Sequence, residues 1–163
     1  MKYYKEEILA LLQKRGIDYQ AIEHEAVYTM DEMKDQGILE RGRVCKNLFL
    51  RDQKGKEHIL VSMPDDKQVS LKDLGQVLGV GKLSFASEER LQKYLAVTHG
   101  AVSPLGVLND ETHTVIVALD EELMSWEKIG VHPNDNTATV WVKPTDLKAI
   151  IDSTTNTCKV LKI

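Results

Sequence analysis

The sequence predicts an α+β fold in which helices surround a largely antiparallel sheet. Segments with strand and helix periodicity are intermixed along the chain, without the regular strand–helix–strand alternation of a parallel sheet. A hairpin is visible where apolar runs at 44–50 and 57–63 flank the turn Asp52-Gln53-Lys54-Gly55. With 163 residues, 42% of them hydrophobic, the chain can bury a core of its own, so we expect one domain over residues 1–163.

The first predicted elements are two helices separated by a strand. Apolar residues at helical spacing over residues 3–14 predict a helix, and residues 18–24 predict a short strand. Thr29 is a suitable N-cap for a second, short helix that carries Met30 and Met33 on one side. The two hairpin strands follow this helix.

After the hairpin, cap and turn residues delimit the remaining elements. Ser70 and Asp73 have the spacing of a capping box, which predicts a helix that ends at Gly79, and Ser87 is expected to cap the next helix. The later predictions are a strand at 114–119, a helical turn at 120–125, a strand at 137–142, a helix from Pro144 to about residue 151, and a closing strand at 158–163.

The composition predicts a reduced, cytoplasmic protein without a cofactor. Four of the first ten side chains are charged, so no secretory signal is expected, and the apolar runs are far too short to cross a membrane. Cys45 and Cys158 are far apart, without the spacing of a metal or redox motif. The histidines show no i,i+4 or His-x-His pairing, so we expect no metal site.

A basic stretch interrupts an otherwise acidic chain. The formal net charge is −4, yet residues 41–56 carry six Lys or Arg side chains against the single acidic residue Asp52. A local basic patch can bind phosphates while the rest of the protein repels them. On charge alone, a solvated hairpin is the simpler interpretation of this stretch.

Three further patches indicate a ligand site. Residues 100–106, Gly-Ala-Val-Ser-Pro-Leu-Gly, suit neither a helix nor a central strand, and such a loop can bring main-chain groups close to a ligand. Lys46 stands in an apolar strand, on the opposite face from Asn47, where it either snorkels at a sheet edge or points into a cavity. His132 begins a Pro-Asn turn and either reaches the rim of a site or bonds to nearby backbone.

In combination, these patches resemble the YbaK/ProX aminoacyl-tRNA deacylase superfamily, which is related to the editing domain of bacterial prolyl-tRNA synthetase. The resemblance covers nearly the whole chain and is closest to the free-standing PrdX/ProXp-ala branch. It implies a mixed, antiparallel-rich, barrel-like sheet, and hydrolysis of the ester in a mischarged tRNA, with alanyl-tRNA(Pro) as the expected substrate. The strings that carry it are Lys46-Asn47-Leu48-Phe49-Leu50, Gly100-x-x-x-Pro104-Leu105-Gly106 and Gly130-Val131-His132-Pro133-Asn134.

The resemblance also implies roles for individual residues. As catalytic residues, Lys46 would hold the terminal phosphate or ribose, Gly100 would let the loop approach the ester carbonyl, and His132 would support the loop or contact the aminoacyl group. The expected substrate-binding residues are Met30, Val44, Asn47, Ala101, Val102, Ser103, Pro104 and Asn134, of which the first two would exclude larger amino acids. The residues expected to contact the tRNA acceptor end are Arg41, Arg43, Arg51, Lys54 and Lys56.

Two alternatives stay open at this point. The protein could deacylate Cys-tRNA or another small aminoacyl-tRNA, or it could be a non-catalytic tRNA-binding or regulatory module of the same fold. An aminoacyl ester is already activated, so the deacylase needs only to position water and stabilise an oxyanion. The expected partner is mischarged tRNA(Pro), bound by a monomer, with a transient contact to prolyl-tRNA synthetase as a further expectation.

Overall fold

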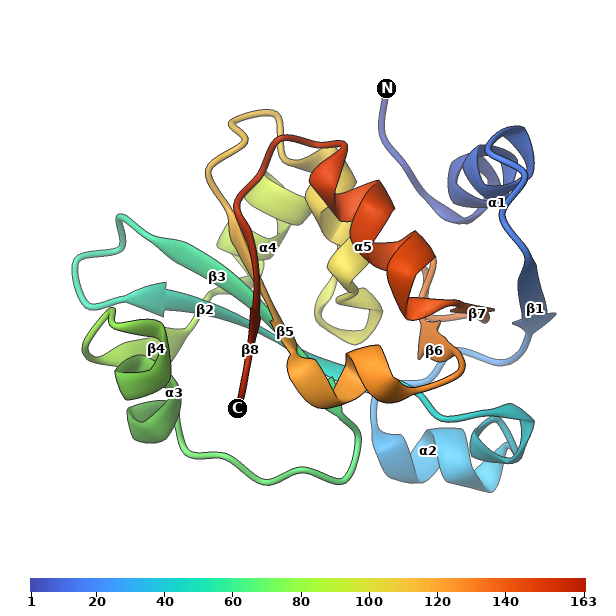
Figure 1. The fold of residues 1–163 in the computed structure, drawn as a ribbon, viewed down its shortest axis with the longest axis horizontal. Coiled ribbons are helices and arrows are strands. Elements are labelled where there is room, and N and C mark those ends of the chain that lie inside the picture. Colours follow the sequence, from blue (N-terminus) through green and yellow to red (C-terminus); the bar gives the residue numbers. More distant parts are fainter.

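In the computed structural model, which describes residues 1–163, two open β-sheets are packed among helices (Figure 1). The strands are β1 (Tyr19–Glu23), β2 (Cys45–Asp52), β3 (His58–Pro64), β4 (Leu83–Phe85), β5 (Ile116–Asp120), β6 (Ile129–Val131), β7 (Ala138–Val142) and β8 (Cys158–Leu161). The α-helices are α1 (Lys5–Lys14), α2 (Met30–Asp35), α3 (Leu71–Leu78), α4 (Glu88–Leu95) and α5 (Pro144–Asp152). Short 3₁₀ helices are η1 (Leu39–Arg41), η2 (His99–Ala101), η3 (Pro104–Asn109) and η4 (Glu121–Ser125).

The predicted α+β class with mostly antiparallel pairing is confirmed. One sheet has the order β1-β7-β6 and is antiparallel throughout. The other has the order β4-β2-β3-β5-β8, in which β2 runs antiparallel to β3 and β4, whereas β5 runs parallel to β3 and β8.

The barrel-like sheet implied by the resemblance is not present. A barrel requires its two outer strands to pair with each other, but β4 and β8 lie at opposite edges of the five-stranded sheet. The two sheets instead meet at an isolated parallel bridge between Val44 and Gly130. This junction places the start of β2 beside β6, and the candidate site forms around it.

Three of the predicted helix starts are confirmed by their caps. In each case a side-chain oxygen accepts the backbone N–H three residues further on, which satisfies one of the free donors at a helix N-terminus. These pairs are Thr29 with Glu32, Ser70 with Asp73, and Ser87 with Arg90.

Two features differ from the sequence-based predictions. The short strand β4, which pairs with residues 50–52 of β2, was not predicted, because three residues carry no readable periodicity. The segment 100–106 is also more ordered than a loop, since it contributes to η2 and η3. The Ser103 oxygen accepts the N–H of Leu105 at 3.1 Å and so caps η3.

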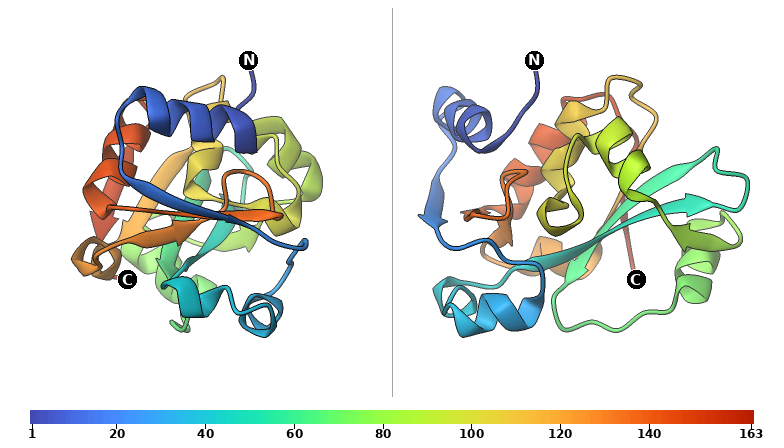
Figure 2. Two further views of the ribbon diagram at one scale, coloured as in Figure 1. Left: turned by 90° about the vertical axis from the view of Figure 1, so that its right-hand side faces the viewer. Right: turned by 180° about the vertical axis from the view of Figure 1, so that it is seen from behind.

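The β2–β3 hairpin extends along the molecule. In Figure 1 its turn lies at the left, near α3 and β4, whereas α1, α2 and the three-stranded sheet lie at the right. Figure 2 shows that sheet face-on, with α1 across one side of it. The largest apolar cluster lies between the sheets and includes Ile8 and Leu12 of α1 and Leu147, Ile150 and Ile151 of α5. No helix combines the length and apolar composition that a membrane crossing would need.

Candidate active site

A cavity of about 140 Å³ lies at the junction of the two sheets. This is the space of roughly five water molecules, so it suits a small chemical group. Six of the residues predicted for the site line it: Met30, Val44, Asn47, Gly100, Val102 and His132. Tyr28, His99 and Thr139 also line the cavity and were not predicted. Strand alternation could have indicated Thr139, but no sequence signal marks Tyr28 or His99 as site residues.

Asn47 ties the 100–106 loop to the five-stranded sheet. Its Nδ2 donates to the carbonyl oxygen of Val102 at 3.3 Å. Its Oδ1 accepts a hydrogen bond of 2.6 Å from Ser62 Oγ on the neighbouring strand β3 and one of 3.5 Å from Cys45 Sγ. Because donor and acceptor are both engaged, Asn47 acts as a positioning residue for the loop.

Lys46 does not line the cavity. As strand alternation predicts, it faces away from Asn47, and its Nζ donates to the backbone carbonyl oxygen of Lys67. The side chain is half-buried and makes no ion pair with a carboxylate. The structure therefore does not bring Lys46 together with Gly100 and His132.

The 100–106 loop presents only part of its chain to the cavity. Gly100 and Val102 line it, and the N–H of Val102 donates to no other group in the protein. A Cβ on Gly100 would lie 2.7 Å from Tyr28 Cδ1 and 3.0 Å from Asn136 Nδ2, so glycine lets these side chains pack directly against the loop. The N–H of Gly100 likewise donates to no other group, so the lining part of the loop offers a small, close-packed backbone with two free donors.

Ala101, Ser103 and Pro104 do not line the cavity, although they were predicted to bind substrate. Ala101 packs into an apolar cluster with Leu95, and Pro104 is buried at the first position of η3. Ser103 is fully buried and its oxygen is engaged as the cap of η3. These three residues therefore stabilise the loop on the side that faces away from the cavity.

His132 presents an unoccupied ring nitrogen. Its Nδ1 lies 2.9 Å from the carbonyl oxygen of Ala138, which can only accept, so Nδ1 carries the proton. The other nitrogen, Nε2, has no hydrogen-bond partner and is a free acceptor in the neutral ring. Burial lowers the pKa of His132 below its usual range, against the opposing effect of the Ala138 carbonyl. The ring is therefore neutral, and able to accept a proton, at neutral pH.

Two other cavity residues have clear electrostatic or structural roles. Burial raises the pKa of the Cys45 thiol to about 12, so this side chain is not a thiolate nucleophile at neutral pH. His24 Nε2 lies 2.9 Å from Thr139 Oγ1 and fixes that hydroxyl at the cavity wall. The His24 and His132 rings are 6.2 Å apart, and the charge of His24 further lowers the pKa of His132.

Asn134 supports the site from outside the lining. It adopts a left-handed backbone conformation with φ of 57° and is buried. Its Nδ2 donates to the carbonyl oxygens of Tyr3, at 2.9 Å, and Leu105, at 3.2 Å. Asn134 therefore links the His-Pro-Asn turn, the η3 loop and the N-terminal segment, whereas its Oδ1 is buried without a hydrogen-bond partner. Its contact with substrate stays a prediction.

The basic stretch 41–56 does not form one surface. Arg41 and Arg43 precede β2, near the junction of the sheets, whereas Arg51, Lys54 and Lys56 lie in or beside the turn between β2 and β3. Arg43 and Arg51 are eight positions apart along the extended chain of β2, a distance of roughly 26 Å at the usual rise per strand residue. No single phosphate can therefore contact both groups, and their contact with the tRNA acceptor end stays a prediction.

Comparison with known proteins finds relatives whose names all refer to tRNA editing or to prolyl-tRNA synthetase. The sequence profile of the aminoacyl-tRNA editing domain matches residues 24–150. The prolyl-tRNA editing protein ProX of Acetoanaerobium sticklandii is 48% identical over 159 residues, covering 98% of this chain and 97% of that protein. The prolyl-tRNA synthetase associated domain-containing protein 1 of Danio rerio is 34% identical, covering 96% of this chain and 86% of that protein.

The same fold occurs among solved structures. A candidate trans-editing enzyme for prolyl tRNA synthetase superposes with a TM-score of 0.69 at 22% identity, covering 96% of this chain and 94% of that one.

Proposed function

Because the chain belongs to the aminoacyl-tRNA editing domain family, we propose that it hydrolyses the ester of mischarged tRNA, with alanyl-tRNA(Pro) as its substrate. The observation that carries this proposal is the 140 Å³ cavity, which is lined by Val102, whose N–H is free, and by His132, whose Nε2 is free. Met30 and Val44 form an apolar wall there. In the proposed complex this wall contacts the methyl group of the alanyl ester, and larger side chains clash with it.

The reaction needs a base and an oxyanion donor. In the proposed mechanism, His132 Nε2 takes a proton from water as the water oxygen attacks the ester carbonyl carbon. The N–H of Val102 stabilises the negative charge that develops on the carbonyl oxygen. The bond to the ribose oxygen then breaks, and the proton passes from His132 to that oxygen, which releases the free amino acid and the uncharged tRNA.

The test is a comparison of four esters. We expect Ala-tRNA(Pro) to lose its amino acid fastest, with Cys-tRNA(Pro), Pro-tRNA(Pro) and Ala-tRNA(Ala) clearly slower, when ester loss is followed with time. A faster reaction with Cys-tRNA(Pro) would move the specificity to another small amino acid. No loss above the buffer rate with any of the four would favour a non-catalytic tRNA-binding module.

Lys46 provides a second test of the proposal. We propose that its ammonium group, which has no carboxylate partner, leaves the Lys67 carbonyl and binds the terminal phosphate when tRNA is present. Lys46→Ala is then expected to lower kcat/KM for Ala-tRNA(Pro) by about tenfold, the usual scale for one charge-assisted contact. Lys159→Ala is the matched control, since Lys159 is an exposed lysine of the edge strand β8. Wild-type kcat/KM with a lowered melting temperature would instead make Lys46 a structural tether of the segment after β3.

A further inference from the structure

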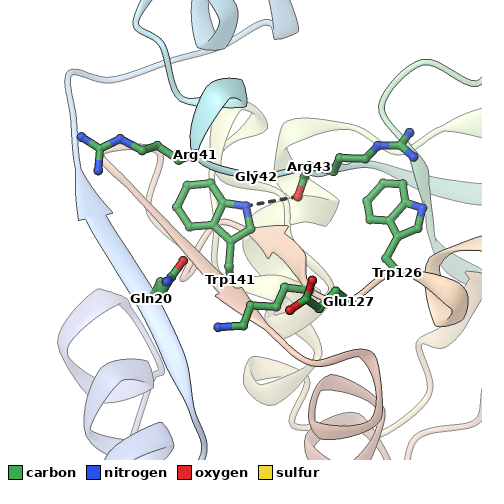
Figure 3. Close-up of a pocket in the computed structure, with 8 residues that line it drawn as sticks. Gln20, Arg41, Gly42, Arg43, Trp126, Glu127 and Trp141 are labelled. Atoms are coloured by element: carbon green, nitrogen blue, oxygen red, sulfur yellow. Dashed lines mark hydrogen bonds between the residues drawn. The ribbon is translucent and has the colours of Figure 1, made fainter.

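A second and larger pocket lies beside the candidate active site, with a volume of about 460 Å³ (Figure 3). Its walls come from β1, the segment between η1 and β2, the segment between η4 and β6, and β7. The side chains relevant to binding are Gln20, Arg41, Arg43, Trp126, Lys128 and Trp141. The proposed hydrolysis uses none of these residues.

The two pockets share a wall. Arg43 lines the larger pocket, and the next residue, Val44, lines the smaller one. The wall is rigid, because the carbonyl oxygen of Arg43 accepts the N–H of Gly130 at 2.9 Å and the indole N–H of Trp141 at 3.1 Å. A ligand in the larger pocket would therefore lie directly next to a substrate in the smaller one.

The larger pocket combines cations with aromatic rings. The Arg43 guanidinium lies 4.0 Å from the centre of the Trp126 ring, and Figure 3 shows Arg41 and Arg43 extending to opposite sides of the Trp141 indole. Arg41 is exposed and has no ion pair, and Lys128 has only a contact of 3.6 Å with the exposed Asp18. Arg43 is already paired with Asp65 at 3.5 Å and Asp66 at 3.4 Å, so Arg41 and Lys128 are the cations available to a phosphate. The lining holds one acid, Glu127, in a protein whose net charge is −4.

Such a set of groups matches single-stranded nucleic acid. Free cations bind backbone phosphates, and a base stacks on an aromatic ring or on the plane of an arginine. The amide of Gln20 adds a donor and an acceptor suited to a base edge. A volume of about 460 Å³ lies within the range of ligand pockets for small organic molecules, so one nucleotide fits.

We propose that this pocket binds one nucleotide of the single-stranded 3′ tail of the tRNA, upstream of the terminal adenosine that carries the ester. Arg41 and Lys128 hold its phosphate, and its base stacks on the Arg43–Trp126 pair. The assignment rests on the proposed function, because it assumes that the esterified adenosine enters the neighbouring cavity.

The first test measures binding of a fluorescent single-stranded RNA with the sequence of a tRNA 3′ tail, by anisotropy over a range of salt. We expect Arg41→Gln and Lys128→Gln each to weaken binding about fivefold or more and to reduce the salt slope by about 0.7, the value for one phosphate contact on a single strand. Trp126→Leu is expected to weaken binding about fivefold or more without changing the salt slope. Lys159→Gln, an exposed charge on β8, should leave both unchanged.

Two results would overturn the assignment of this pocket to the tRNA tail. Wild-type affinity and salt slope in Arg41→Gln and Lys128→Gln would overturn the assignment, and Arg41 is exposed and unpaired, so that variant folds normally. Competition by free AMP with an affinity equal to that of the RNA would assign the pocket to a free nucleotide and overturn the tRNA assignment.

Parallel assays of ester hydrolysis separate this inference from the proposed function. If the wild-type protein hydrolyses no ester but the RNA-binding pattern holds, the proposed reaction fails and the pocket assignment stands. If the wild-type protein hydrolyses the ester and the pocket variants have the same KM as the control Lys159→Gln, the pocket assignment is wrong and the proposed function stands. With both correct, the pocket variants raise KM and leave the single-turnover rate at saturation unchanged.

Discussion

Replacing His132 by asparagine is expected to lower the rate of Ala-tRNA(Pro) hydrolysis about 100-fold, the lower end of the usual contribution of a general base. The amide nitrogen of asparagine can still donate to the Ala138 carbonyl, as Nδ1 of His132 does at 2.9 Å. It offers no atom in place of Nε2, so the fold is kept and only the proposed base is removed. Single-turnover hydrolysis with saturating enzyme measures the effect.

The pH dependence of kcat/KM tests the role of His132 more specifically. Burial lowers the pKa of His132, so the neutral, proton-accepting form persists at neutral pH and is lost only as the pH falls below the ordinary imidazole range. We therefore expect kcat/KM of the wild-type enzyme to be constant near neutrality and to fall on the acid side. In His132→Asn this acid limb should be absent, because the titrating group is gone.

The control for this experiment is His113→Asn. His113 is exposed and has a positive φ of 56°, a conformation that asparagine tolerates well. This variant should retain the wild-type rate and acid limb. If His132→Asn also retained both, the proton of the attacking water would go elsewhere, with the neighbouring ribose hydroxyl of the substrate as the remaining candidate.

The second large effect concerns stability, at the wall between the two pockets. A Cβ on Gly130 would lie 2.6 Å from Trp141 Nε1, 2.6 Å from Val44 Cγ1 and 2.9 Å from the Arg43 carbonyl oxygen. Trp141 and Val44 are both buried and cannot move aside freely. Gly130→Ala is therefore expected to destabilise the protein by about 3 kcal/mol and to lower Tm by roughly 6–12 °C, as measured by circular dichroism.

Two further variants show whether the contact is the cause. Gly79→Ala introduces the same methyl group where no atom lies within 4 Å, although at a positive φ of 69°, so it should cost only about 1 kcal/mol. Val44→Ala removes one of the colliding atoms and should recover part of the stability lost in Gly130→Ala. A Gly130→Ala protein with wild-type Tm would mean that the junction of the sheets yields easily, and the shared wall would lose its rigidity.

Local features of the fold were predictable because each is encoded within a few residues. Thr29, Ser70 and Ser87 start helices since their side chains satisfy N–H groups that lie three positions away. The turn at 52–55 and the apolar runs beside it specify a hairpin in the same way. The opposite orientation of Lys46 and Asn47 follows directly from the alternation along a strand.

Features that depend on distant segments were not predictable. The open sheets result from the placement of β4 and β8 at separate edges, which pairing across the whole chain decides. Basic residues adjacent in sequence separate in space because an extended strand runs between them. Ser103 and Asn134 looked available for substrate, yet in the folded protein Ser103 Oγ accepts the N–H of Leu105 and Asn134 Nδ2 donates to the Tyr3 carbonyl oxygen.

The sequence by itself determined the fold class, the helix starts, the hairpin and the family resemblance, including the motifs around Lys46, Gly100 and His132. Only the tertiary structure decided which atoms of those motifs share a cavity, that Lys46 faces away from it, and that a pocket with Arg41 and Trp126 adjoins it. The physical reason is the distance along the chain over which each interaction acts. Propensity, capping and alternation act over a few neighbouring residues, whereas a site is formed by strands and loops that approach one another only when the core is buried.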